Sequence, residues 1–300
     1  MPLKKKILII GKNGFFGRSL EKSLKFHKLK LIGRKDELEK INLKKFDVII
    51  NCAADIYNEK KMFYSNTLLV YRLLENYLNQ KSKAKIIHFG SSGEYGNSKL
   101  SPSENQVINP CSIYTGTKAA ATMLLQSFSK EFKIKSVILR TFTVYGPYEN
   151  QSRLLPFIFR HLLLKNKLTI FKGHQDYLYI DDLCKIIDQL VTKWSVKGYG
   201  EIINISSGKK YENKEVLKIC EKITKIKSKA KVLKSYSQSN HNKYYNYQQK
   251  ALNTKKMNNL KFKSKTDIKS GIVKYWNEIH KNKDLKEHTM NFTKKFFNKW

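Results

Sequence analysis

The feature that most constrains the fold of this chain is a glycine loop close to its start. The apolar residues 7–10 lead directly into Gly11-Lys12-Asn13-Gly14-Phe15-Phe16-Gly17, and a helix-compatible segment follows. Glycines let the backbone approach a pyrophosphate closely, and the first turn of a helix offers unpaired N–H groups and a positive potential. The order strand, GxxGxxG turn and helix therefore predicts a dinucleotide site in an α/β fold. The alternative is a tight strand-to-helix turn that binds nothing.

Short β-branched runs alternate with longer helical patterns through the first two-thirds of the chain, as is typical of a parallel sheet covered by helices on both faces. This layout predicts a doubly wound parallel sheet. The dinucleotide-binding domain is expected in residues 1–150, a smaller C-terminal α/β substrate lobe in 151–282 with some chain crossing back, and a basic tail in 283–300. Strands are expected at residues 6–10, 29–32, 47–51, 85–89, 136–140, 168–171 and 201–205, and helices at 15–26, 60–80, 112–132, 154–165, 181–193 and 268–279. The polar stretch 225–256 is expected to be exposed loop.

Charge gives an ambiguous indication of the partner. Basic residues outnumber acidic ones 59 to 24, a net charge of +35 that is common in proteins that bind nucleic acids or anionic membranes. However, six of the 59 are Arg, the residue that contacts phosphates and bases bidentately, and the lysines are spread along the whole chain. We therefore expect no nucleic-acid partner and a solvated tail, with attraction of the tail to an anionic membrane as the alternative.

Cysteine and histidine spacing gives no indication of a metal site. The four cysteines (Cys52, Cys111, Cys184 and Cys220) form no CxxC pair, and the seven histidines show no HxxH spacing. The first apolar run ends after four residues, and no run approaches the eighteen or so apolar residues that a membrane helix needs. We expect reduced thiols, no metal, no integral membrane segment and a cytoplasmic location.

The end of the second expected strand bears on the form of the dinucleotide. An acidic residue there accepts the ribose hydroxyl of NAD, whereas a cation accommodates the 2′-phosphate of NADP. The strand ends in Gly33-Arg34-Lys35, and Lys12 supplies a second cation from the glycine loop. These residues favour NADP over NAD. The opposing interpretation is that Asp36 reaches the ribose, if the strand ends later.

A tyrosine and a lysine four residues apart are the candidate catalytic pair. Tyr114 and Lys118 lie on one face of an expected helix, and a neighbouring ammonium stabilises a phenolate, which makes Tyr a usable acid or base near neutral pH. The alternative is a surface pair that arises by chance. Ser91 follows an expected strand and would lie at the carboxyl edge of the sheet, where such sheets bind ligands.

Together these motifs resemble the extended short-chain dehydrogenase/reductases of the nucleotide-sugar epimerase/dehydratase family, over nearly all of residues 5–279. That family has a Rossmann sheet. The matching elements are the loop at Gly11, Asn51-Cys52-Ala53-Ala54, Asn66, Ser91 ahead of Tyr95-Gly96, the YxxxK at Tyr114, Arg140-Thr141-Phe142-Thr143-Val144-Tyr145-Gly146-Pro147, Asp176-Tyr177-Leu178-Tyr179-Ile180-Asp181-Asp182-Leu183, and Ile203-Asn204-Ile205-Ser206-Ser207-Gly208.

The resemblance implies a role for each matching position. Tyr114 is the acid/base, Lys118 holds the nicotinamide ribose, and Ser91 binds the reacting sugar oxygen, with Ser92 as its substitute if the register slips. The implied NAD(P) contacts are Gly11, Lys12, Asn13, Gly14, Phe15, Phe16, Gly17, Arg34, Asn42, Ala53, Ala54, Asn66, Tyr114 and Lys118. The implied nucleotide-sugar contacts are Ser92, Thr143, Arg153 and Gln175. The helix expected at residues 60–80 resembles the one through which family members form homodimers. The aromatic residues on it or next to it are Tyr57, Phe63, Tyr64, Tyr71 and Tyr77.

Departures from the family pattern narrow the expected activity. Dehydratases carry Asp and Glu directly after the active-site Ser or Thr, where this chain has Ser92 and Gly93, with Glu94 nearby. Thr143 stands in place of Asn, Gln175 in place of Arg, and Asn42 in place of an acid. Losing the Arg removes a strong phosphate partner, for which Arg153, His174 or a lysine of the second lobe can compensate.

The sequence therefore predicts an NAD(P)-dependent nucleotide-sugar oxidoreductase, either an epimerase or a 4-keto-sugar reductase, with a Tyr general acid/base. The resemblance places it in the synthesis of a surface polysaccharide. The alternatives are a nucleotide-sugar 4,6-dehydratase and a non-catalytic NAD(P)-binding sensor or scaffold.

Overall fold

A six-stranded parallel sheet forms the centre of the molecule. The computed structural model describes residues 3–96, 101–233 and 255–290. The strands are β1 (Lys6–Ile10), β2 (Lys28–Ile32), β3 (Val48–Asn51), β4 (Lys85–Ser91), β5 (Ser136–Thr141) and β9 (Glu201–Ile205), in the spatial order β2-β1-β3-β4-β5-β9. Every pairing between neighbours is parallel. The predicted doubly wound sheet is confirmed. The strand order reverses at β1, which places a ligand crevice at the carboxyl ends of β1 and β3.

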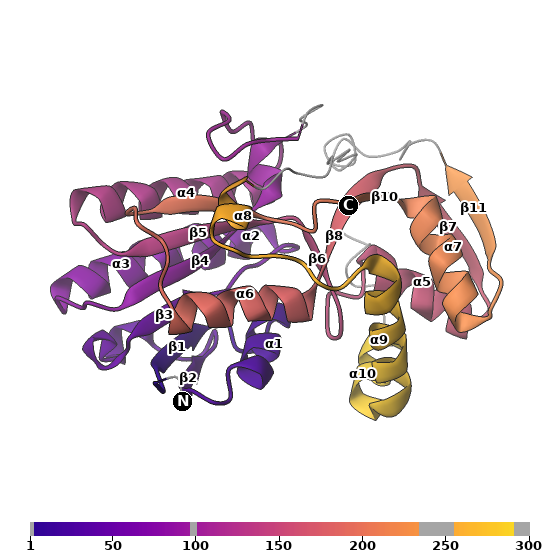
Figure 1. The fold of residues 1–300 in the computed structure, drawn as a ribbon, viewed down its shortest axis with the longest axis horizontal. Helices are drawn as coiled ribbons and strands as arrows, with labels where there is room; N and C mark the ends of the chain where they lie inside the picture. The colour runs from indigo at the N-terminus through magenta and orange to yellow at the C-terminus, as the bar shows by residue number, and fades with distance from the viewer. Residues whose placement is uncertain (1–2, 97–100, 234–254, 291–300) are drawn as a thin grey trace.

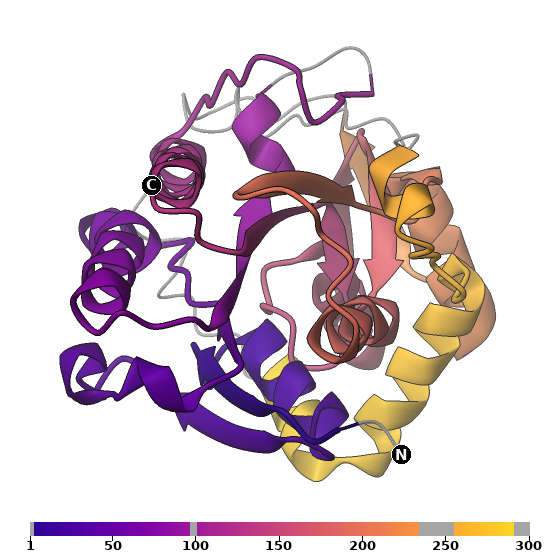
Figure 2. The same cartoon turned by 60° about the vertical axis from the view of Figure 1, so that its left-hand side comes forward.

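Helices cover both faces of this sheet. Figures 1 and 2 show α1 (Phe15–Ser23) and α6 (Ile180–Thr192) on one face, and α3 (Leu69–Asn79) and α4 (Ile113–Glu131) on the other. Successive side chains of a strand point to opposite faces. Ile7 and Ile9 accordingly belong to one buried cluster, whereas Leu8 and Ile10 belong to the other. Burial on both faces explains why β1 is apolar from Ile7 to Ile10.

The helix expected at residues 60–80 is composite. It consists of α2 (Glu59–Met62), a π-helical segment (Phe63–Leu68) and α3. π-Helical turns of this kind are rare and often mark functional sites. Two 3₁₀ turns, Leu38–Lys40 and Leu43–Lys45, lie in the connection between β2 and β3.

Smaller elements fill the C-terminal half. They are α5 (Leu154–Leu163), α7 (Asn213–Thr224), a three-stranded sheet in the order β10-β8-β6, and the parallel pair β11 and β7. The strands are β6 (Thr143–Tyr145), β7 (Lys167–Phe171), β8 (His174–Tyr179), β10 (Lys210–Glu212) and β11 (Lys229–Leu233). β6, β8 and β10 were not predicted. Between these elements, α6 and β9 cross back to the central sheet.

The stretch expected to be exposed loop contains β11, so the loop prediction is wrong for residues 229–233, and the first part of the expected tail is helical. β11 lies in the polar stretch, where backbone pairing with β7 needs no apolar run. Helix α8 (Lys255–Asn259) begins at the end of that stretch, and residues 234–254 lie outside the described part. After α9 (Ile268–Lys281), the expected tail forms α10 (Lys283–Met290) because Leu285 and Thr289 are buried. Residues 291–300 also lie outside the described part.

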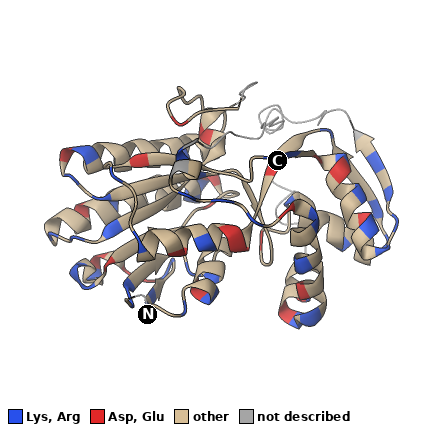
Figure 3. Ribbon diagram, in the orientation of Figure 1, with Lys and Arg blue, Asp and Glu red and all other residues tan. Residues whose placement is uncertain are grey.

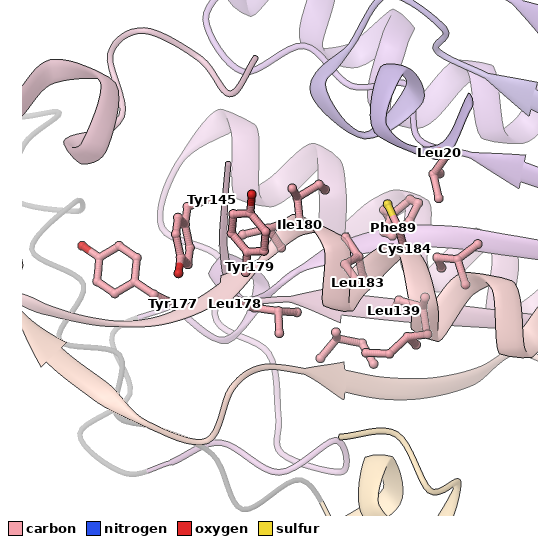
Figure 4. Close-up of a cluster of buried hydrophobic side chains, with 14 of the residues drawn as sticks. Leu20, Phe89, Leu139, Tyr145, Tyr177, Leu178, Tyr179, Ile180, Leu183 and Cys184 are labelled. Carbon is pink, nitrogen blue, oxygen red and sulfur yellow. The ribbon is translucent and has the colours of Figure 1, made fainter. Parts of the chain in front are cut away.

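One buried cluster runs from the central sheet into the C-terminal half. Figure 4 shows Leu20, Phe89 and Leu139 in the same cluster as Tyr145 and Tyr179. Figure 3 shows Lys and Arg on helices and strands of both halves. Within the described residues, no helix combines the length and apolarity needed to cross a bilayer.

Glu149 is a buried carboxyl group in the loop between β6 and α5. Its side chain is 2% exposed, and Oε1 accepts a hydrogen bond from Gly146 N at 3.3 Å. Burial raises the pKa of Glu149 from 4.5 to about 8, although Arg153 opposes the shift. The folded protein therefore holds a proton that the unfolded chain releases between these two values.

This burial predicts a pH-dependent loss of stability. As the pH rises from about 4.5 to about 8, the folded state binds more protons than the unfolded state, so the free energy of unfolding falls. Glu149→Gln keeps the shape and removes the charge. We expect the variant to be more stable than wild type above pH 8, by a few kcal/mol, and equally stable below pH 4.5. Urea denaturation across this range measures the difference. A difference that does not change with pH contradicts the prediction.

Candidate functional site

The glycine loop is a backbone cradle at the carboxyl end of β1. Gly11 has a φ of +101°, and a Cβ there would lie 2.7 Å from Ala53 N, while a Cβ on Gly17 would lie 2.2 Å from the Gly11 carbonyl oxygen. Gly14 precedes α1, and none of the described side chains caps this helix. No acidic residue lies in its first turn. These features fit the pyrophosphate of a dinucleotide, because the backbone is exposed and the helix N–H groups are available.

The predicted cations around the tip of β2 are each paired with a carboxylate. Lys12 Nζ lies 3.2 Å from Asp36 Oδ2, and the same oxygen accepts a hydrogen bond from Gly33 N at 2.7 Å. These contacts lower the pKa of Asp36. Arg34 Nη2 lies 3.1 Å from Asp55 Oδ2. The sequence patterns did not predict a role for Asp55, although its position in the loop after β3 places it at the same sheet edge as Arg34.

The buried side chain of Asn66 links this edge of the sheet to helix α4, which carries Tyr114. Asn66 Oδ1 accepts from Asp55 N at 2.8 Å, and Nδ2 donates to Asp55 O at 3.0 Å and to Thr117 Oγ1 at 2.9 Å. Thr117 Oγ1 in turn donates to Tyr114 O at 2.9 Å. The π-helical segment thus presents Asn66 between the loop after β3 and the first turns of α4.

Lys118 is fixed beneath the end of β4. Its side chain is 3% exposed, and Nζ donates a hydrogen bond to the Phe89 carbonyl. Burial lowers the pKa of Lys118 to about 8, with Glu94 and Cys52 opposing the shift. Tyr114, half-buried, lies one turn earlier on the same helix. Helix α4 begins with a capping box in which Ser112 Oγ accepts from Thr115 N at 3.2 Å.

Ser91 is the last residue of β4 and caps the 3₁₀ turn Ser92–Tyr95. Ser91 Oγ accepts from Gly93 N at 3.1 Å, and Ser91 N donates to Glu94 Oε1 at 2.7 Å. A Cβ on Gly93 would lie 2.6 Å from Thr115 Cγ2, so the turn packs directly on the start of α4. This close approach brings the Ser91 turn next to the helix that carries Tyr114.

Glu94 is fully buried and holds this turn. Its Oε2 accepts from Arg140 Nε at 2.7 Å, and the two side chains are 0% and 3% exposed. The Arg140 guanidinium lies 4.6 Å from the centre of the Tyr95 ring, and Tyr95 OH donates to Asn204 Oδ1 at 2.7 Å. Both carboxylate oxygens of Glu94 are thus engaged, an arrangement that the sequence spacing alone did not predict.

The remaining predicted residues lie at several places. Thr143 on β6 donates to Gln175 Oε1 on β8, so two of the residues that depart from the family pattern contact one another. Arg153 is exposed at the start of α5. Asn42 caps the turn at Leu43–Lys45. Ala54 is exposed, and the rings of Phe15 and Phe16 lie 5.4 Å apart, with Phe16 against Phe89.

One further contact joins the loops that follow β3 and precede α5. Tyr57 OH and Ser152 Oγ lie 2.6 Å apart, which connects the loop after β3 to the loop before α5. Within the described residues, no cluster of three or more His, Cys, Asp and Glu side chains is arranged to hold a metal ion.

Comparison with known proteins identifies the family to which this chain belongs. Residues 7–206 match the model of the NAD dependent epimerase/dehydratase family. The chain belongs to this family. It is 30% identical over 220 residues to a dTDP-D-glucose 4,6-dehydratase of Dictyostelium discoideum, covering 66% of this chain and 50% of the relative. It is 27% identical over 195 residues to UDP-glucuronate 4-epimerase 3 of Arabidopsis thaliana, covering 59% and 45%. The chain thus spans about half the length of these relatives.

Solved structures show the same fold. UDP-glucuronic acid 4-epimerase from Bacillus cereus, in complex with UDP-glucuronic acid and NAD, superposes with a TM-score of 0.80 at 23% identity, covering 92% of this chain and 99% of that one. RMD from Pseudomonas aeruginosa, complexed with NADPH, superposes with a TM-score of 0.77 at 17% identity, again covering 92% and 99%. Structural neighbours in this family therefore include both NAD and NADPH complexes.

Proposed function

We propose that this chain is an NAD(P)-dependent nucleotide-sugar oxidoreductase, either an epimerase or a 4-keto-sugar reductase. The observation that carries the proposal is the assembly at the end of β4. Lys118 is anchored to the Phe89 carbonyl, Ser91 closes the strand, and the Ser91 turn packs on the first turn of the Tyr114 helix. A sensor or scaffold needs the glycine loop but not this set of side chains.

In this proposal, the chain's own residues transfer the proton and position the sugar and the dinucleotide. A bound dinucleotide supplies the hydride donor or acceptor. Tyr114 moves the proton of the sugar hydroxyl, with the Lys118 ammonium stabilising its phenolate. Ser91 hydrogen-bonds the reacting oxygen, and its turn is held in place by Glu94. The backbone cradle at Gly11 and Gly17 orients the dinucleotide, so positioning contributes much of the rate.

We propose that dehydration is not the reaction. Elimination of water needs an acid and a base beside the sugar, and the positions after Ser91 hold Ser92 and Gly93. Glu94, the carboxyl group left open by the sequence, is 0% exposed and engaged with Ser91 N and Arg140. We therefore favour an epimerase or a reductase over a 4,6-dehydratase as the activity of this chain.

We propose NADP as the preferred dinucleotide. Arg34 at the tip of β2 has a side chain 65% exposed, available to a 2′-phosphate. Asp36 is turned back onto Gly33 N and Lys12. On the substrate side, we propose that Thr143, Gln175 and Arg153 contact the nucleotide diphosphate.

We also propose that a second copy of the chain covers the face formed by α3 and α4. Phe63, Tyr64 and Tyr71 are 53%, 64% and 40% exposed there, and Met123 of α4 is 58% exposed. Tyr71 packs edge-on against Phe128 of α4, which makes the two helices one apolar surface. Tyr77, by contrast, is buried in the monomer.

The form of the retained dinucleotide tests the proposal and separates its two branches. The purified protein is denatured, and any released dinucleotide is identified by mass spectrometry. Stoichiometric NAD supports an epimerase that recycles its cofactor and contradicts the NADP preference. NADPH, or an empty site that binds added NADPH, supports a reductase. A protein that neither retains nor binds a dinucleotide contradicts the proposed function.

A further inference from the structure

The ion pair between Arg34 and Asp55 crosses the end of the strand that carries the glycine loop. In the sheet order β2-β1-β3, Arg34 follows β2 and Asp55 follows β3, so β1 lies between them. Their 3.1 Å contact therefore spans the carboxyl end of β1, where open α/β sheets bind ligands. Gly11 approaches the backbone of Ala53, two residues before Asp55, on the same side. The pair thus belongs to the dinucleotide crevice.

Asp55 is the fixed partner of this pair. Its side chain is 13% exposed, and Oδ1 accepts from Tyr57 N at 3.1 Å and from Asn58 N at 2.9 Å. Its backbone N and O are both bonded to the Asn66 side chain. Arg34 is the exposed partner: its side chain is 65% exposed, and, within the described residues, its hydrogen bonding is confined to Asp55.

Two cations at this end of the crevice each face a carboxylate. Arg34 faces Asp55, and Lys12 faces Asp36 at 3.2 Å. The ribose hydroxyl of NAD adds no charge to this arrangement. A 2′-phosphate adds an anion that must take the Arg34 guanidinium from Asp55, or share it with a carboxylate of the same sign.

We infer that Asp55 sets the preference between NADP and NAD by competing with the 2′-phosphate for Arg34. This inference rests on the proposed dinucleotide-binding function. With Asp55 present, the ratio of NADP affinity to NAD affinity is lower than it would be if Arg34 had no carboxylate partner. It is a specificity-determining residue that acts through Arg34 and has no part in the chemical step.

Asp55→Asn tests the competition with little disturbance of the loop. The amide keeps one oxygen for Tyr57 N and Asn58 N and removes the negative charge that faces Arg34. Dissociation constants for NADP⁺ and NAD⁺ are measured by calorimetric titration of the full chain. We expect NADP⁺ to bind about fivefold more tightly to the variant, as removal of one partly exposed ion pair gives, and NAD⁺ to change less than about twofold.

Two controls separate this effect from a general change of charge. Glu37→Gln removes one negative charge from the connection between β2 and β3, which also contains Arg34. Glu37 pairs with Lys40 at 2.9 Å, so this variant should leave the ratio of the NADP⁺ and NAD⁺ dissociation constants unchanged. In an Arg34→Gln background, Asp55→Asn should give no gain for NADP⁺. Thermal denaturation confirms that each variant is folded.

The outcomes are distinct. If wild type binds a dinucleotide and Asp55→Asn leaves the ratio unchanged, the inference is overturned and the proposed function stands. If Asp55→Asn weakens NADP⁺ binding, Asp55 orients Arg34 for the phosphate, and the competition is likewise overturned. If neither dinucleotide binds to wild type or to the variant, the proposed function and the inference fall together.

Discussion

Tyr114→Phe is expected to lower the turnover of an accepted nucleotide sugar by about 10²–10⁴-fold, the usual contribution of a positioned general acid or base. The ring remains in the first turn of α4, where the capping box of Ser112 and Thr115 holds the backbone. Dinucleotide affinity should fall far less than turnover, because the Gly11 cradle and Lys118 are untouched. Steady-state turnover and dinucleotide titration measure the two effects separately.

A tyrosine away from the site supplies the matched control for this experiment. Tyr199, 40% exposed in the connection between α6 and β9, loses its hydroxyl in Tyr199→Phe with no expected effect on turnover. If Tyr114→Phe retains turnover within about tenfold of wild type, another group moves the proton and the catalytic assignment is wrong.

The second large effect concerns the buried pair Glu94 and Arg140. Glu94→Ala should destabilise the fold by about 3–5 kcal/mol, because it leaves an uncompensated guanidinium in the interior and removes the acceptor of Ser91 N. Urea denaturation measures the loss. Replacing both partners with apolar residues, Glu94→Leu and Arg140→Met, should cost much less than the sum of the two single changes, since no lone charge then stays buried.

An exposed ion pair shows what burial adds. Glu37 and Lys40 lie 2.9 Å apart with side chains 63% and 76% exposed. Glu37→Ala should cost at most about 1 kcal/mol, as is usual for surface pairs. Equal losses in Glu94→Ala and Glu37→Ala would falsify the claim that Glu94 anchors the Ser91 turn.

Local patterns predicted the elements that position the site. β1 has the predicted bounds, Lys6–Ile10, and the glycine loop that follows it forms the backbone cradle. These features depend on residues close together in the chain: an apolar run, glycines that permit close approach, and a helix start. The YxxxK spacing placed Tyr114 and Lys118 on α4 for the same reason.

Contacts between distant segments were not predictable in this way. β11 forms because β7 offers a free edge, and α10 forms because Leu285 finds a buried position. The pairing of Arg34 with Asp55 depends on β1 lying between the strands that precede them. The contact between Thr143 and Gln175 likewise needs the pairing of β6 with β8. Sheet order decides the contacts between strands, and burial against distant segments decides α10.

The most direct test of the central claim is the dihydronicotinamide absorbance of the protein when nucleotide sugars are added. Purified chain with its retained or added dinucleotide is mixed with UDP- and dTDP-sugars that carry a 4-hydroxyl or 4-keto group. For a reductase, we expect the band to fall when a 4-keto sugar is added. For an epimerase, which returns its hydride to the sugar, we expect the 4-epimer of at least one nucleotide sugar to appear by chromatography. Free sugars and free nucleotides should give no response, and the Tyr114→Phe variant should respond far more slowly. A protein that binds the dinucleotide but shows neither a change in the band nor a new nucleotide sugar by chromatography across the whole panel contradicts the account.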